Sequence, residues 1–88
     1  MRLDYISPKA VENASTKLLL KQALSDKERL TIIRYLAKAA KLAGDLRQWH
    51  NFLSLIENYE KLPDLQKIDE ILTRWISKLE IPNFFEEE

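Results

Sequence analysis

The chain has no cysteine, one glycine, three prolines and one histidine among its 88 residues. Without cysteine there can be no disulfide framework, no thiolate metal site and no cysteine nucleophile. A single glycine leaves no glycine-rich phosphate-binding loop, and the single histidine, His50, leaves no zinc motif that needs two imidazoles. The scarcity of glycine and proline also argues against the many tight turns of a β-sandwich or barrel. We therefore expect neither an enzyme nor a bound cofactor or metal ion.

Long apolar runs are missing as well. The longest unbroken aliphatic run is Leu18–Leu20, whereas about 20 apolar residues are needed to cross a bilayer. Residues 1–8 lack the apolar segment of a secretion signal. We expect no membrane contact and a cytoplasmic location. Lys+Arg and Asp+Glu number 14 each, so the net charge is zero, and the 45% hydrophobic content is that of one globular domain.

Capping residues divide the chain into helices. Ser7, Ser25 and Asp45 each stand where an N-cap side chain would close a helix start, and Gly44 stands where a left-handed C-terminal cap is needed. Pro82 ends the last helical pattern. The predicted helices cover residues of about 8–24, 26–42, 46–61 and 64–80, and a tail follows over residues 81–88.

Each predicted helix has an apolar stripe at three- and four-residue spacing. The connections between helices are short, so consecutive helices should be antiparallel. The sequence therefore predicts an all-α fold, a compact antiparallel four-helix bundle. Within it, residues 34–38 match residues 74–78 in type at each position, which would fit two similar αα-hairpins. Any two capped amphipathic helices align comparably, so the hairpin repeat is kept as an alternative.

Charge is distributed unevenly along the chain. Residues 1–44 contain nine Lys+Arg against four Asp+Glu, and residues 45–88 contain five against ten. Four cations of the second predicted helix fall within an arc of about 60° at 100° per residue, and the first predicted helix adds two. We call these six the basic stripe: Lys27, Arg34, Lys38, Lys41, Lys17 and Lys21. Such a stripe could contact nucleic-acid phosphates or an acidic partner. The simplest interpretation is the solvated side of a bundle helix.

The tail is the other candidate. It ends in two phenylalanines and three glutamates, Phe84, Phe85, Glu86, Glu87 and Glu88. This segment could dock as a linear motif, with aromatic side chains in a groove and acids on a basic rim. Alternatively, the phenylalanines fold back over the open end of the bundle.

These features favour a small, non-catalytic protein–protein interaction module, an adaptor or regulator. A domain of this size buries only about 60–65% of its unfolded surface, so a partner would help to stabilise it. Halves of opposite charge favour head-to-tail association with a second copy or steering towards another charged protein. The alternative is a nucleic-acid-binding protein that uses the basic stripe.

Overall fold

The computed structural model describes residues 7–78. This part of the chain is all-α, with no strand, as the sequence predicts. Its elements are α1 (Pro8–Leu19), α2 (Asp26–Leu42), α3 (Leu46–Glu57), the 3-10 turn η1 (Tyr59–Lys61) and α4 (Leu65–Lys78). The helices pack into a compact globule with a radius of gyration of 12.2 Å.

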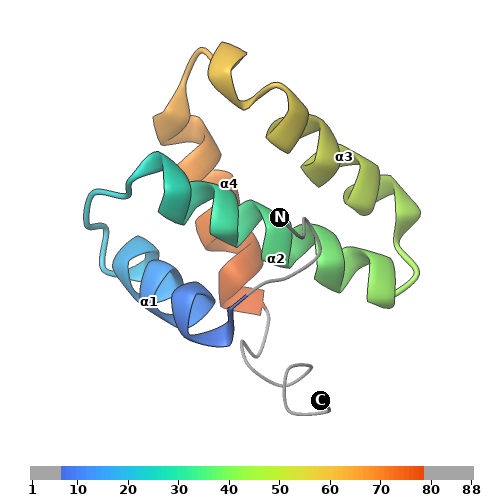
Figure 1. The fold of residues 1–88 in the computed structure, drawn as a ribbon, viewed down its shortest axis with the longest axis horizontal. Coiled ribbons are helices and arrows are strands. Elements are labelled where there is room, and N and C mark those ends of the chain that lie inside the picture. Colours follow the sequence, from blue (N-terminus) through green and yellow to red (C-terminus); the bar gives the residue numbers. More distant parts are fainter. Residues whose placement is uncertain (1–6, 79–88) are drawn as a thin grey trace.

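Helix α2 is the centre of the fold (Figure 1). It contacts α1, α3 and α4, and α1 also contacts α4. Helices α1 and α3 both run antiparallel to α2, whereas α4 crosses behind it in this view. Helices α3 and α4 meet through Phe52 and Trp75, whose ring centroids are 5.7 Å apart at an interplanar angle of 84°. The four-helix array is thus wrapped around one central helix.

The core follows from this arrangement. Helix α2 presents buried apolar side chains over more than half of its circumference, because it has neighbours on three sides. Helix α3 supplies a single fully buried side chain, Phe52. The buried apolar residues are Val11, Ala14, Leu18, Ile32, Ile33, Tyr35, Leu36, Ala37, Phe52, Ile68, Leu72 and Ile76.

The helix starts are those that the capping residues predict. The Ser7 Oγ accepts a hydrogen bond from the Ala10 N–H at 3.4 Å. Ser25 and Glu28 form a reciprocal capping box. The Asp45 carboxylate accepts from the Gln48 N–H at 3.2 Å. Each bond satisfies a backbone donor that the first helical turn leaves without an intrahelical partner.

Two predicted helix ends are wrong. Helix α1 ends at Leu19 rather than near residue 24, because Lys21 adopts a left-handed conformation with φ of 59°. The Lys21 N–H donates to the Leu18 carbonyl at 3.1 Å and the Gln22 N–H to the Lys17 carbonyl at 2.9 Å, a Schellman cap. This reversal lets Leu24 pack against the core while the chain turns back into α2.

Helix α3 ends at Glu57 rather than near residue 61. The Asn58 side-chain amide donates to the Ser54 carbonyl at 2.9 Å, and the chain then tightens into η1. Helix α4 begins at Leu65, as the break at Pro63 and Asp64 predicts. The predicted last turn over residues 79–80 and the tail over residues 81–88 lie outside the described residues. The hairpin repeat stays a prediction.

Candidate binding clefts around a buried arginine

A buried cation lies at the junction of α2, η1 and α4. The Arg29 side chain is only 8% exposed. Its Nε and Nη2 donate to the two carboxylate oxygens of Asp69 at 2.7 and 3.0 Å, and its Nη1 donates to the Tyr59 hydroxyl at 2.8 Å. The Tyr59 hydroxyl in turn donates to Asp26 at 2.7 Å. We call these four residues the Arg29 network.

The hydrogen bonds and burial within the network shift the pKa values of Arg29 and Tyr59. Hydrogen bonding to Asp69 raises the pKa of Arg29 above its ordinary value. Burial raises the pKa of Tyr59, and the hydrogen bond to Asp26 adds to this. Arg29 therefore stays cationic and Tyr59 stays neutral at physiological pH. A buried guanidinium is tolerated only when it is paired in this way.

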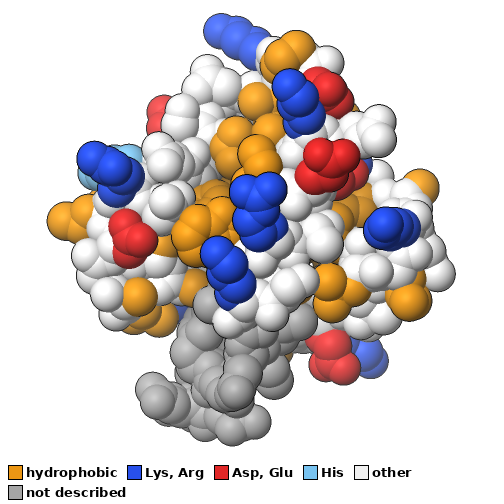
Figure 2. Space-filling model, turned by 180° about the vertical axis from the view of Figure 1, so that it is seen from behind, with side chains coloured by type: hydrophobic (Ala, Val, Ile, Leu, Met, Phe, Trp, Pro, Cys, Tyr) orange, Lys and Arg blue, Asp and Glu red, His pale blue; other side chains and the backbone are white. Residues whose placement is uncertain are grey.

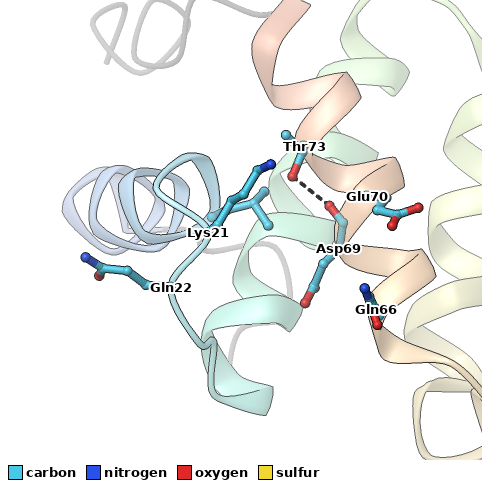
Figure 3. A pocket seen from close by; sticks show the side chains of 7 residues that line it. Lys21, Gln22, Gln66, Asp69, Glu70 and Thr73 are labelled. Carbon is cyan, nitrogen blue, oxygen red and sulfur yellow. Dashed lines mark hydrogen bonds between the residues drawn. The ribbon is translucent and has the colours of Figure 1, made fainter.

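One hollow lies on the α4 side of the network, between the end of α1 and α4 (Figure 3). We call it the α1–α4 hollow; its volume is about 460 Å³. The Lys21 amino group reaches across it towards Thr73, whose hydroxyl donates to the Asp69 carbonyl at 2.8 Å. Its lining carries both charge signs and two amides: Leu18, Lys21, Gln22, Gln66, Asp69, Glu70 and Thr73.

A second hollow lies on the other side of the network, where α2, the end of α3, η1 and the start of α4 meet. We call it the η1 cleft; its volume is about 710 Å³. Its apolar side chains, Leu30, Ile56, Leu62 and Leu65, are all half-buried, and its charged rim is exposed. The rim consists of three acids and one base: Asp26, Glu57, Glu60 and Lys61. This composition suits a ligand that is both apolar and cationic.

The basic stripe does not form one surface. Lys27, Arg34, Lys38 and Lys41 share the outer side of α2, opposite its buried side, as their spacing predicts. The two cations predicted for the first helix are engaged elsewhere. The Lys17 Nζ lies 2.8 Å from the Glu28 carboxylate. This contact and the hydrogen bond from the Ser25 N–H lower the pKa of Glu28 to about 2. Lys21 lines the α1–α4 hollow.

The aromatic and histidine candidates have ordinary placements. Lys41 lies over the Trp49 ring, 4.9 Å from its centroid, and the exposed His50 ring lies 5.0 Å from that of Trp49. Among residues 7–78, no group of three metal-binding side chains converges. The predicted tail motif, Phe84, Phe85, Glu86, Glu87 and Glu88, lies outside the described residues.

Sequence reasoning missed a second row of cations, on α4. Figure 2 shows the side of the molecule opposite to that in Figure 1, where Lys and Arg side chains follow one another down the middle of the face beside hydrophobic ones. Helix α4 lies on this side, and its exposed Lys67, Arg74 and Lys78 fall within an arc of about 40° at 100° per residue. We call these three the α4 row. Beside them lie Ile71, which is 39% exposed, and the half-buried Trp75.

The Arg29 network was also missed, although the sequence carried a signal for it. Arg29 stands three, four and seven residues before Ile32, Ile33 and Leu36, and so lies on the apolar stripe of α2. A charge in that position needs a buried partner of opposite sign. Its partner, Asp69, lies forty residues away, so only the tertiary arrangement identifies it.

Comparisons with protein-family models, with curated proteins and with solved structures found no match to this chain. No helix in residues 7–78 is long and apolar enough to cross a membrane. The clefts and charged surfaces of residues 7–78 are therefore the features from which a function can be proposed.

Proposed function

We propose that this chain is a non-catalytic protein–protein interaction module, an adaptor or regulator. The observation that supports it is the incompletely covered apolar side of α3. Phe52 is fully buried, whereas Trp49, Leu53, Leu55 and Ile56 are half-buried. Covering apolar surface contributes about 25 cal/mol per Å². A partner that packs along α3 would therefore gain binding energy that the fold leaves unused.

The surroundings of α3 support the same proposal. The η1 cleft lies at the C-terminal end of α3, and a smaller hollow of about 110 Å³, lined by Phe52 and Trp75 among others, lies towards its N-terminal end. Hollows of this kind accept side chains that project from a partner, and such anchors dominate the energetics of interfaces. The α3 helix therefore combines exposed apolar area with places for anchoring residues.

A peptide-display selection against the folded chain tests this proposal. We expect enriched peptides to bind the wild type and to lose at least about tenfold in affinity on Leu53→Ala combined with Ile56→Ala. The matched control, Leu19→Ala combined with Leu20→Ala, removes exposed apolar side chains of the α1 end and should leave binding unchanged. Circular dichroism verifies that both variants are folded. A selection that yields no binder, or binders indifferent to the α3 variant, would refute the proposal.

Nucleic-acid binding is a second candidate, because four cations share the outer side of α2. Anisotropy of labelled duplex and single-stranded nucleic acid, at low and high salt, tests it. If it holds, binding weakens steeply with salt and is lost on Lys27→Glu combined with Arg34→Glu. Binding that survives this charge reversal, or no binding at low salt, would rule out the α2 cations as a phosphate-contacting surface.

A further inference from the structure

We propose that the η1 cleft receives the α4 row of a second copy of this chain, so that copies associate head to tail. The inference rests on the proposed function and names its partner. The two surfaces are different, so each copy offers one cleft and one row. Such a contact is heterologous and builds rings or open chains rather than a symmetric pair.

The cleft provides the acidic and apolar half of the contact. Glu57 and Glu60 are exposed on its rim, which carries one cation, Lys61. The third rim acid, Asp26, already accepts the hydrogen bond of Tyr59. Helix α3 also ends at this rim with no basic residue in its last turn, so the negative end of its dipole is not compensated there. The positive start of α2 already has two acids in its own first turn.

The α4 row provides the basic and apolar half. Its three cations are exposed, and Ile71 and Trp75 lie beside them on the same side of the helix. Lys78 lies over the Trp75 ring, 5.3 Å from its centroid. The acid Glu70 is also a lining residue of the α1–α4 hollow. An apolar strip edged by cations thus matches an apolar floor edged by carboxylates, which is the complementarity that specific interfaces show.

Sedimentation of four charge variants over a hundredfold concentration range tests the inference. The cleft variant is Glu57→Lys with Glu60→Lys, and the row variant is Lys67→Glu with Arg74→Glu. The swap variant combines all four changes. The matched control reverses two cations of the competing surface on α2, Lys27→Glu with Arg34→Glu.

We expect the wild type to self-associate, more strongly at low salt, and the cleft and row variants each to weaken association at least about tenfold. The control should associate like the wild type. An equimolar mixture of cleft and row variants should associate again, because one retains an intact row, the other retains an intact cleft, and their two reversed surfaces are complementary to each other. The swap variant should associate again.

Three results would overturn the inference. One is a wild type that stays monomeric throughout; if selected peptides still bind along α3, the proposed interaction function stands and only its partner is wrong. Another is self-association that persists in the cleft and row variants or is lost in the α2 control, which would place the contact on another surface. A mixture of cleft and row variants that stays dissociated while each alone is weakened would equally exclude the head-to-tail contact.

Discussion

Removing Asp69 should destabilise the fold more than removing Arg29, although the two side chains form one ion pair. The Arg29 side chain is 8% exposed and that of Asp69 is 30% exposed. Asp69→Ala leaves the buried guanidinium with only the exposed Asp26 carboxylate, 3.5 Å from its Nη1. Losing one partner of a fully buried ion pair costs about 3–5 kcal/mol. The partial exposure of Asp69 moves the expected loss to the lower end of that range.

Arg29→Met removes the cation and leaves its two hydrogen-bond partners, Asp69 and Tyr59, in place. The freed Asp69 carboxylate lines the α1–α4 hollow and can be hydrated from there. The Tyr59 hydroxyl keeps its acceptor, Asp26. The methionine retains apolar contact in the core, so the expected loss is about 1–2 kcal/mol. The double variant, Arg29→Met with Asp69→Ala, leaves neither member of the pair unpaired. The losses in free energy of unfolding of the two single variants should therefore add up to about 1–3 kcal/mol more than the loss of the double variant.

Urea unfolding at pH 7, followed by tryptophan fluorescence and by circular dichroism, measures the free energy of unfolding of the wild type, the two single variants and the double variant. A domain of this length is stable by about 4–13 kcal/mol, so each loss can be resolved. Equal losses for the two single variants would contradict the argument from unequal burial. A coupling free energy near zero would show that the two side chains do not depend on each other, whatever their distance.

Three further predictions concern single side chains of α1 and its neighbourhood. Ser15→Ala should raise the free energy of unfolding in urea by about 1 kcal/mol, because the Ser15 hydroxyl is fully buried with no hydrogen-bond partner in the described part of the chain; a loss would show that the hydroxyl is bonded. Lys21→Gly should raise it by about 0.5–1 kcal/mol, since glycine adopts the left-handed conformation without a Cβ clash, while Lys21→Ala, which keeps the Cβ, should give no such gain. Lys17 and the Ser25 N–H lower the pKa of Glu28 from 4.5 to about 2. The stability that this ionised carboxylate contributes is therefore present above pH 4.5 and is lost as the pH falls towards 2. Glu28→Gln should flatten the pH dependence of the free energy of unfolding in urea over this range, and an unchanged slope would assign that dependence to other acids.

Helix starts were predictable because capping is a local interaction. The side chain of Ser25 reaches a backbone N–H only three residues ahead, and no tertiary neighbour is needed. The end of α2 was predictable for the same reason, since Gly44 adopts a positive φ of 80°, a conformation that glycine favours. The end of α1 was not, because Lys21 adopts the same region without being a residue type that signals it.

The clefts could not be predicted, because they depend on which helices meet. Spacing placed four cations on one side of α2, and the structure confirms that placement. It could not show that Lys41 lies over Trp49 or that Lys17 pairs with Glu28. Nor could it pair Arg29 with Asp69, since a periodic pattern describes one helix at a time. The sequence thus identified which residues share a side of a helix, whereas the contacts between helices were seen only in the structure.

The Arg29 network links the stability of the fold to the shape of the η1 cleft. A buried ion pair is weak evidence for stability, since apolar residues of similar volume often do as well. Apolar replacements of the ion pair could not, however, hydrogen-bond to Tyr59 and so hold η1 in one position. This turn has three residues and no side-chain cap of its own, yet it forms a wall of the cleft. Tyr59 fixes it by bonding to Arg29 and Asp26 of α2. A wall ordered before binding lowers the entropic cost of association, so the buried charge is best explained by what it positions.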